Sequence, residues 1–280
     1  MKAQSRISER EREAPGLSTD IDPASTFEQR YLSLLKLCLL GLAVPHPHSA
    51  WHREDLSLGV APLHPDNLEA RLEGRDWPLE GYTMIGMKRL ENVQACVEDV
   101  IANDVPGDLI EAGVWRGGAA MLMRALLRLH SVGDRAVFAA DSFEGLPSPD
   151  PERFPVDSGS RIHEIDFLSV SLEDVKSNFQ RFGLLDDQVR FVKGWFRDTL
   201  PSLSDATWSV IRLDGDMYES TMVSLEALYP NLSPGGYVII DDFHFIRRCQ
   251  RAVLHYREAH GIDEEMKQVD WNAAYWQKAT

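Results

Sequence analysis

Cysteine is scarce in this 280-residue chain, and its placement argues against both a disulfide framework and a zinc site. The three cysteines, Cys38, Cys96 and Cys249, lie far apart and form no C-x-x-C pair. An odd number of widely spaced thiols does not predict a disulfide framework, and no cluster of histidine and cysteine predicts a zinc site. This cysteine usage favours a reducing compartment, so we expect the protein to be cytoplasmic.

Long apolar runs are also missing. The segment 31–44, YLSLLKLCLLGLAV, resembles the core of a signal peptide, but it contains Lys36 and is too short to span a bilayer. The 30 residues before it hold five basic and six acidic residues, so the positive region of a signal peptide is absent. We therefore predict an amphipathic helix that packs on the domain or over a pocket, and no membrane partner.

Positive charge is in short supply. Lysine and arginine number 29 against 44 acidic residues, which gives a formal net charge of −15. Such a chain repels phosphates, so we expect no nucleic-acid partner. A cation bound by carboxylates would offset part of this charge locally. The length and a hydrophobic content of 44% fit one large domain with a real core.

The composition divides the chain into three parts. Residues 1–25 are polar and charged, and we expect a disordered tail. Residues 26–82 form an N-terminal segment, in which we predict a helix at 27–45, a short helix at 68–72 and otherwise irregular structure, because five prolines interrupt it. Long irregular segments of enzymes often act as lids, and we expect this role here. Residues 83–280 form the main domain.

Strands and helices alternate regularly after residue 83. Predicted strands cover 108–113, 136–141, 189–193, 208–213 and 237–241, predicted helices cover 90–101, 119–129, 172–182, 220–229 and 245–260, and residues 266–276 supply one or two last strands. The alternation predicts a doubly wound α/β fold, in which helices cover both faces of a mostly parallel sheet.

The first candidate site motif, EAGVWRGG, spans residues 111–118 between a predicted strand and helix. Its glycines let the backbone approach a ligand closely. Trp115 occupies the second glycine of a dinucleotide fingerprint, and Ala119 stands where a phosphate-binding loop has lysine. The loop thus favours a nucleoside without a pyrophosphate, and Glu111 can accept from its ribose or amino group. The alternative is an ordinary strand-to-helix turn.

Two further motifs follow strands and suit the same ligand. Asp141 ends the next strand, where an acid can bind both ribose hydroxyls, and Phe143 can flank an adenine. The alternative is a helix cap, which Asp141 or Ser142 also suits. Residues 194–196, Gly-Trp-Phe, follow a strand and can line the adenine pocket, or be plain core aromatics.

Four acids are the most informative feature. Asp214 and Asp216 follow one predicted strand, and Asp241 and Asp242 follow the next, with the first acids of the two pairs 27 residues apart. That spacing is the length of one strand–helix–strand unit, so both pairs should meet at one edge of the sheet. Unpaired carboxylates would repel each other, and a hard cation such as Mg²⁺ resolves this. The alternatives are solvated acids or helix caps.

This geometry suits transfer of a methyl group to a hydroxyl. A metal ion lowers the pKa of a sugar or phenol hydroxyl, and a nearby carboxylate can take its proton. We assign Asp214, Asp241 and Asp242 to the metal and Asp216 to the role of general base, with Asp214 as the rival. His244 and His163 are second choices for the base or for orienting the substrate.

Together these motifs resemble the macrocin O-methyltransferase family, which methylates deoxysugar hydroxyls of glycosylated antibiotics. The resemblance covers about residues 83–276. It rests on residues 83–86 (TMIG), 105–118 (VPGDLIEAGVWRGG), 141–147 (DSFEGLP), 183–190 (GLLDDQVR), 194–196 (GWF), 212–220 (RLDGDMYES), 232–242 (LSPGGYVIIDD) and 275–276 (YW).

The resemblance implies a class I methyltransferase fold with a seven-stranded Rossmann-like sheet and S-adenosylmethionine as methyl donor. It also implies Mg²⁺ held by Asp214, Asp241 and Asp242, a homo-oligomer, and a sugar of a secondary metabolite as acceptor. The expected cofactor residues are Thr83, Met84, Glu111, Gly113, Val114, Gly117, Asp141, Ser142, Phe143, Gly194, Trp195, Phe196 and Asp214. Thr83 and Met84 would lie near the amino-acid end of the cofactor.

The first 60 to 80 residues match the family poorly, and in such enzymes this region helps to form the acceptor site. Three other functions are compatible with parts of the sequence. One is a metal-dependent O-methyltransferase of phenols or catechols. The second is a nicotinamide dehydrogenase, against which the missing G-x-G-x-x-G speaks. The third is a non-enzymatic adenosylmethionine-binding or scaffold protein, which gives the four acids no role.

Overall fold

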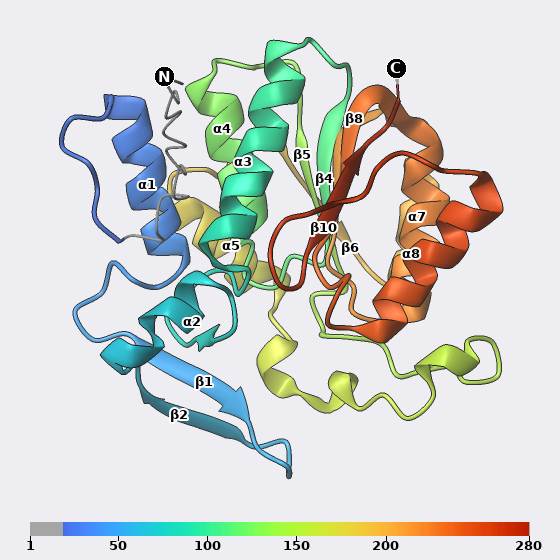
Figure 1. Cartoon of the computed structure of the whole chain (residues 1–280), viewed down its shortest axis with the longest axis horizontal. Coiled ribbons are helices and arrows are strands. Elements are labelled where there is room, and N and C mark those ends of the chain that lie inside the picture. The colour runs from blue at the N-terminus through green and yellow to red at the C-terminus, as the bar shows by residue number, and fades with distance from the viewer. Residues whose placement is uncertain (1–18, 280) are drawn as a thin grey trace, which may run out of the picture.

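A seven-stranded sheet forms the centre of the computed structural model, which describes residues 19–279 (Figure 1). Its strand order is β6-β5-β4-β7-β8-β10-β9; the pairs among β4 to β8 are parallel, and β10 is antiparallel to β8 and β9. The strands are β4 (Asp108–Ala112), β5 (Val137–Asp141), β6 (Val189–Lys193), β7 (Trp208–Leu213), β8 (Leu232–Ile240), β9 (Lys267–Gln268) and β10 (Ala274–Gln277). The predicted mostly parallel sheet of seven strands is confirmed.

Helices cover both faces of the sheet, as the alternating pattern predicted. One face carries α3 (Gly86–Ala102), α4 (Gly118–Leu129) and α5 (Leu172–Arg181), and the other carries α7 (Tyr218–Leu228) and α8 (Arg247–His260) (Figure 1). The buried apolar side chains form two clusters, one under each layer of helices. The short helix α6 (Phe196–Thr199) follows β6 directly.

Strand β7 shows why the central strands of the sheet could be predicted from the sequence. All six of its residues are buried, and five of them are apolar or small. Strands covered on both faces need such continuous runs, because neither face meets water. The exception is Arg212, whose side chain is 1% exposed. A buried arginine must be paired, and its partners belong to the candidate site.

The N-terminal segment is more ordered than we predicted. Helix α1 (Phe27–Leu39) begins at Thr26 with a capping box and ends six residues before the predicted boundary at residue 45. Its buried face, which includes Leu35 and Leu39, belongs to the same core cluster as α3 and α4, so it packs on the main domain. No helix among residues 19–279 is long and apolar enough to cross a membrane.

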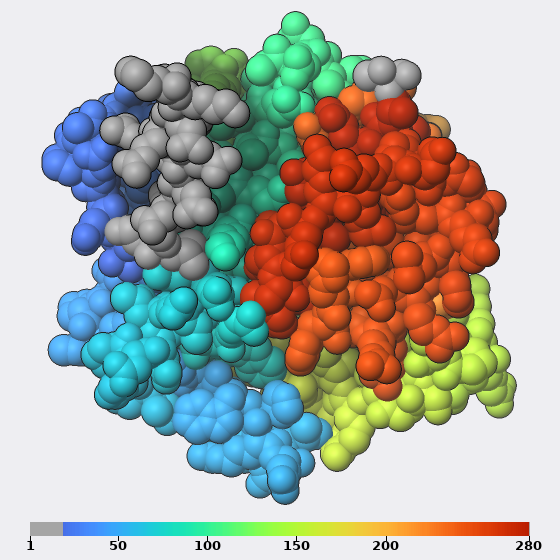
Figure 2. All heavy atoms as spheres, in the orientation of Figure 1, coloured from blue at the N-terminus to red at the C-terminus, as the bar shows by residue number. Residues whose placement is uncertain are grey.

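A three-stranded sheet in this segment corrects the prediction of mostly irregular structure. Strands β1 (His48–His52), β2 (Leu58–Pro62) and β3 (Trp77–Pro78) pair antiparallel in the order β2-β1-β3, and helix α2 (Leu68–Leu72) lies where we predicted it. We interpreted the prolines as breakers of regular structure, but prolines are tolerated at edge strands and strand ends. Figure 2 shows this sheet at the same end of the molecule as the segment that follows β5.

Of the predicted tail, residues 1–18 lie outside the described part of the chain. Residues 19–25 are described and contain no helix or strand. A bend here ends in the cap of α1, where the side chain of Thr26 accepts from the backbone N–H of Gln29 at 3.2 Å.

Asp186 is the centre of an ion-pair cluster at the end of the sheet opposite the candidate site. Arg124 donates to both of its oxygens, at 2.9 and 2.6 Å, and Arg128 donates to one at 2.9 Å. These guanidinium groups lower the pKa of Asp186 to about 2. The carboxylate therefore stabilises the fold above its unfolded pKa, and this stability is lost as pH falls through about 2.

We expect Asp186→Asn to lower the free energy of unfolding at pH 7 by about 1–2 kcal/mol, a value reduced for the partial exposure of the pair. The difference from the wild type should shrink between about pH 4 and pH 2, as the wild-type carboxylate takes up its proton. Urea unfolding over this pH range measures it. The neighbouring exposed residue supplies the control, because Asp187→Asn should change stability little. Equal effects of the two substitutions would contradict the role of the cluster.

Candidate active site

The candidate site lies at the topological switch point of the sheet, where successive strands are added on opposite sides of β4. The chain passes from β4 to β5 on one side, whereas β7 pairs with β4 on the other. Backbone hydrogen bonds tie the strand ends together: Gly113 N–H donates to Ala140, Asp214 N–H to Ala112, and Asp241 N–H to Leu213, at 2.8–3.0 Å. The motifs that follow these strands are thus neighbours at one edge of the sheet, which is where open α/β sheets bind ligands.

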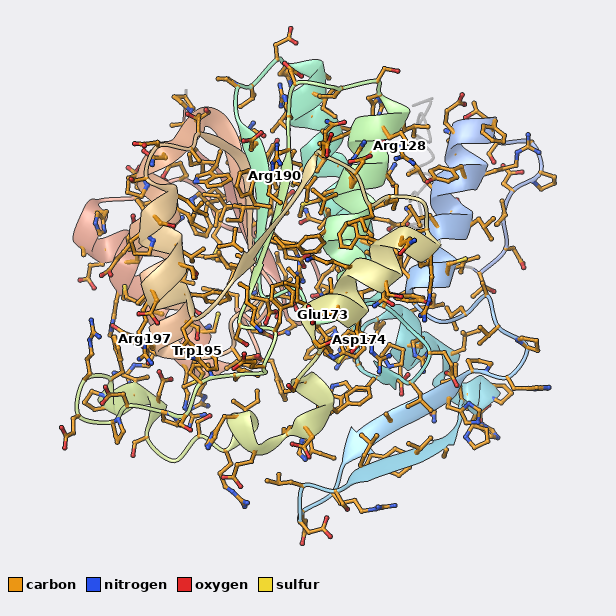
Figure 3. The ribbon with its side chains drawn as sticks, turned by 180° about the vertical axis from the view of Figure 1, so that it is seen from behind. Arg128, Glu173, Asp174, Arg190, Trp195 and Arg197 are labelled. Atoms are coloured by element: carbon orange, nitrogen blue, oxygen red, sulfur yellow. The ribbon has the colours of Figure 1, made fainter. Side chains whose placement is uncertain are left out.

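A first cavity at this edge has a volume of about 780 Å³ with its open mouth included. Eight predicted cofactor residues line it: Met84, Gly113, Asp141, Ser142, Gly194, Trp195, Phe196 and Asp214. Sequence analysis missed other lining residues, among them Gly145, Leu146, Pro147, Arg197 and Glu219. Figure 3 shows Trp195 and Arg197 together beyond β6, at the opposite end of the sheet from Arg128 and Arg190.

Gly113 is required by the close approach of two backbones. Its φ is +93°, and a Cβ atom at this position would lie 1.8 Å from the carbonyl oxygen of Asp214. Neither the conformation nor the space admits a side chain. The glycine therefore lets the loop after β4 touch the loop after β7, and it brings the first cavity against the first of the four acids.

Asp141 has a structural task as well as a place in the first cavity. Its two oxygens accept from the backbone N–H groups of Val114 and Phe143, both at 2.8 Å. Burial raises the pKa of this carboxyl, and these hydrogen bonds oppose the rise. The backbone N–H of Trp115 at 3.4 Å and the hydroxyl of Ser142 at 3.3 Å also donate to it, so four donors surround this carboxylate. Asp141 thus holds both glycine-rich loops in place beside the cavity.

Five predicted cofactor residues lie elsewhere. Thr83, Glu111 and Val114 line a second cavity, described below. Gly117 and Phe143 line neither cavity. Gly117 caps α4 at φ +90° and lies against Phe179, and Phe143 is buried in the core beside Phe191. These two residues shape the loops around the first cavity, but neither of them lines it.

Three of the four acids form a compact group, which we call the acid cluster: Asp214, Asp216 and Asp242. Each offers one oxygen, and these oxygens lie within 4.8 Å of one another. One oxygen of Asp242, Oδ2, is buried and has no hydrogen-bond partner. Asp216 has a φ of +57°, a strained conformation for a residue with a side chain. Burial and the neighbouring carboxylates raise the pKa of Asp216 to about 7 and the pKa values of the other two well above normal.

Such a group fits a divalent cation. Oxygen ligands suit Mg²⁺, the orphaned oxygen of Asp242 needs a partner, and a bound cation would relieve the mutual repulsion.

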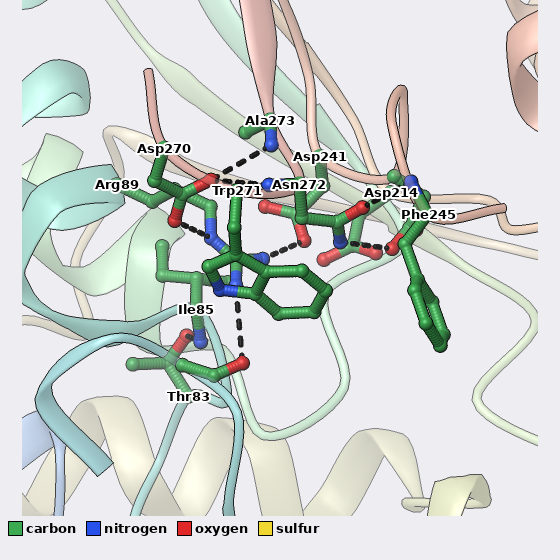
Figure 4. Close-up of polar contacts among 12 residues, drawn as sticks. Thr83, Ile85, Arg89, Asp214, Asp241, Phe245, Asp270, Trp271, Asn272 and Ala273 are labelled. Carbon is green, nitrogen blue, oxygen red and sulfur yellow. Dashed lines mark hydrogen bonds and ion pairs between the residues drawn. The ribbon is translucent and has the colours of Figure 1, made fainter. Parts of the chain in front are cut away.

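Asp241, which we predicted as a metal ligand, is not a member of the acid cluster. One of its oxygens accepts from Arg89 of α3 at 2.5 Å (Figure 4), and the other accepts from Arg212 of β7. Successive side chains at a strand end point to opposite sides, so Asp241 turns toward the arginines while Asp242 turns toward Asp216. The structure therefore groups Asp216, which we predicted as the base, with Asp214 and Asp242.

Arg212 links the glycine motif to the acids. Its guanidinium donates to Glu111 at 2.5 Å and to Asp214 at 3.1 Å, besides its contact with Asp241. Burial raises the pKa of Glu111 to about 7, and Arg212 opposes this rise. Arg212 thus engages one oxygen of Glu111, whereas the other, Oε2, is buried without a hydrogen-bond partner. Sequence analysis gave Arg212 no role, although a basic residue inside an apolar strand was the available signal.

The second cavity extends from the acids to the N-terminal segment, and its volume is about 1400 Å³ with its open mouth included. It shares five lining residues with the first: Met84, Trp115, Leu168, Asp214 and Asp216. Apolar and aromatic side chains dominate the rest, among them Leu56, Trp77, Ile162, Ile165, Phe245, Ile246 and Trp271. His163 and His244, our second choices for the base, line neither cavity.

Comparison with known proteins agrees with this geometry. The family model described as macrocin-O-methyltransferase (TylF) matches residues 29–278. This range includes most of the N-terminal segment, which corrects our expectation of a poor match there. The chain is 48% identical to demethyldecarbamoylnovobiocin O-methyltransferase of Streptomyces niveus, over 89% of this chain and 93% of the relative.

A second relative and a solved structure are also similar to this chain. The chain is 53% identical to 8-demethyl-8-(2,3-dimethoxy-alpha-L-rhamnosyl)-tetracenomycin-C 4'-O-methyltransferase of Streptomyces olivaceus, over 74% of this chain and 80% of the relative. The solved structure of the O-methyltransferase NovP superimposes with a TM-score of 0.82 at 46% identity, over 90% of this chain and 100% of that one. The chain therefore belongs to the macrocin O-methyltransferase family and is an O-methyltransferase with the class I fold.

Proposed function

We propose that this enzyme transfers the methyl group of S-adenosylmethionine to a sugar hydroxyl of a glycosylated natural product, with Mg²⁺ at the acid cluster. The observation that carries the proposal is that Asp214 and Asp216 line both cavities. A donor in the first cavity and an acceptor in the second would meet at these acids, and such positioning is what methyl transfer needs. The names of two relatives support this acceptor class. One is an O-methyltransferase of demethyldecarbamoylnovobiocin, and the other is an O-methyltransferase of a rhamnosyl tetracenomycin C.

The first cavity is our proposed donor site. Asp141, Trp195 and Phe196 line it, and in this proposal Asp141 accepts from the ribose hydroxyls while Trp195 and Phe196 contact the adenine. Met84 and Gly113 lie on the side that adjoins the second cavity or the acids, where the sulfonium end would be.

We propose that Asp214 and Asp242 hold the cation and that Asp216 takes the proton of the acceptor hydroxyl, with Asp214 as the alternative base. A bound Mg²⁺ would lower the pKa of that hydroxyl. Asp241 adds negative charge nearby, but both of its oxygens are already engaged by arginines. This assignment keeps the predicted base and drops Asp241 from the predicted ligand set.

The second cavity is our proposed acceptor site, and the N-terminal segment would act as its lid. His52 and Trp77 contribute to its wall from β1 and β3. All three of its arginines are already engaged: Arg89 by Asp241 and Asp270, Arg161 by Glu164, and Arg248 by backbone carbonyls. An apolar wall with engaged cations favours the aglycone of a finished glycoside over the pyrophosphate of a nucleotide sugar. A homo-oligomer and a cytoplasmic location stay predictions.

The function is tested by methyl transfer from labelled S-adenosylmethionine with chelator-stripped enzyme. We expect turnover of glycosylated aromatic or macrolide acceptors only after Mg²⁺ is added back, and little turnover of catechol. Turnover that is insensitive to chelation would contradict the metal role and leave the methyltransferase intact. Catechol as the better acceptor would contradict the sugar assignment.

Phe245 offers a sharper test of the acceptor site. It is 71% exposed at the rim of the second cavity, where its ring lies 5.5 Å from the ring of Trp271, centroid to centroid. We expect Phe245→Ala to raise KM for an intact glycoside about 10-fold, by loss of apolar contact. KM for the simple methyl glycoside of the same sugar should change little. Leu254→Ala is the matched control, because Leu254 is 46% exposed on α8 and lines neither cavity.

A further inference from the structure

The loop between β9 and β10 lies against the second pair of acids (Figure 4). Three of its residues, Asp270, Trp271 and Asn272, belong to none of the sequence motifs, and Trp271 and Asn272 also line the second cavity. Asp270 and Asn272 are buried polar residues, 8% and 4% exposed. Buried polar groups are normally hydrogen-bonded, and one bond from this loop reaches an acid of the site, from Asn272 to Asp242.

Asn272 makes a hydrogen bond with each end of its amide. Its Nδ2 donates to Asp242 Oδ1 at 2.9 Å, and its Oδ1 accepts from the backbone N–H of Phe245 at 3.0 Å. The second bond fixes which end of the amide faces Asp242, because an N–H can be satisfied only by the amide oxygen. The orientation of the donor is therefore set by backbone rather than by the carboxylate that it holds.

This contact leaves Asp242 with one oxygen in use and one free. Oδ1 accepts from Asn272, whereas Oδ2 is buried without a partner, and Asp242 groups with Asp214 and Asp216. We propose that Asn272 is a positioning residue, which holds the Asp242 carboxylate so that its free oxygen is presented to the cation of the acid cluster. The proposal rests on the metal site of the proposed function.

The loop that carries Asn272 is anchored independently of any cation. Asp270 Oδ1 accepts from the backbone N–H groups of Asn272 and Ala273, both at 2.8 Å, and Oδ2 accepts from Arg89 at 2.9 Å. Arg89 also donates to Asp241 at 2.5 Å. One arginine thus joins the C-terminal loop to the acid pair after β8.

The N-terminal segment supplies two further anchors. The indole N–H of Trp271 donates to the carbonyl of Glu73 at 2.8 Å, and Arg89 donates to the carbonyl of Gly74 at 3.2 Å. The Asn272 amide is therefore preorganised by groups on three parts of the chain. Hydrogen-bond partners of metal ligands act in this way, and their loss typically weakens metal affinity about 10–100-fold.

The test measures Mn²⁺ binding to the full-length enzyme saturated with S-adenosylhomocysteine, by electron paramagnetic resonance of free Mn²⁺. We expect Asn272→Ala to raise the Kd for Mn²⁺ about 10–100-fold. Affinity for S-adenosylhomocysteine should stay close to that of the wild type, because Asn272 does not line the first cavity. Gln277→Ala is the matched control: it removes an amide bonded to the carbonyl of Gly235 near the other end of β10.

The outcomes separate the two proposals. An unchanged Kd for Mn²⁺ in Asn272→Ala, with wild-type Mn²⁺ binding intact, would overturn the role of Asn272 alone. Failure of the wild type to bind Mn²⁺ would overturn the metal site and this inference with it. Should Asn272→Ala not fold, Asn272→Ser keeps a small polar side chain beside the Phe245 N–H and gives the same comparison.

Discussion

Asp216→Asn is expected to lower kcat about 10²- to 10⁴-fold, the contribution usual for a general base. The substitution preserves the shape of the side chain but removes its ability to take a proton from the acceptor. Asp216 lines both cavities, so it faces the place where donor and acceptor would meet. Affinity for S-adenosylhomocysteine should change little, because the proposed adenine and ribose contacts lie on other residues.

The pH dependence of the wild type gives an independent readout. Burial and the charges of Asp214 and Asp241 raise the pKa of Asp216 to about 7 in the absence of a cation. A base works only when it is deprotonated, so kcat/KM should fall as pH drops through its pKa. Bound Mg²⁺ attracts the carboxylate and lowers this pKa, so the fall should lie below about pH 7 in the loaded enzyme. Profiles between about pH 5 and pH 9 measure it.

The rival base is tested by the same measurement. If Asp216 is the base, Asp216→Asn should flatten the acidic limb of the profile, whereas Asp214→Asn should mainly weaken the binding of Mg²⁺. The reverse pattern would assign the proton transfer to Asp214. A wild-type kcat in Asp216→Asn would remove this residue from the mechanism altogether.

The fold was predictable because parallel strands buried on both faces require nearly continuous apolar runs in the sequence. The run 208–213 became β7 with the bounds that we predicted, and the predicted helix at 172–182 became α5, which Ser171 caps. The two acid pairs came together because β7 and β8 are adjacent and parallel, so their carboxyl ends meet. Periodicity and spacing are local signals, and they sufficed wherever the sheet imposed the geometry.

What the sequence did not predict depends on contacts between distant segments. Arg89 and Asp270 pair across 181 positions, and no spacing rule connects a helix residue with a C-terminal loop. The direction of Asp241 was missed for a different reason. Both acids after β8 look equivalent in sequence, but one turns toward two buried arginines and the other toward Asp216. Only the three-dimensional placement of the arginines separates them.

Arg212→Met is expected to destabilise the protein by about 3–5 kcal/mol, the cost of leaving buried charge without its partner. Arg212 is 1% exposed and contacts Glu111, Asp214 and Asp241, so its loss leaves three carboxylates with less compensation. Arg128→Met is the control, because that arginine is 48% exposed and should cost less than about 1 kcal/mol. Urea unfolding at fixed pH gives both values.

The sign of the pH effect identifies the cause. Without Arg212 the pKa values of Glu111 and Asp214 in the folded state should rise further above their unfolded values, because Arg212 now lowers them. Such groups stabilise the fold when they are protonated, so the variant should recover stability as pH falls and lose it as pH rises. A packing defect would instead destabilise the variant equally at all pH values, and that result would contradict an electrostatic role for Arg212. Its charge would then not be what limits the rise in the pKa of Glu111 and Asp214.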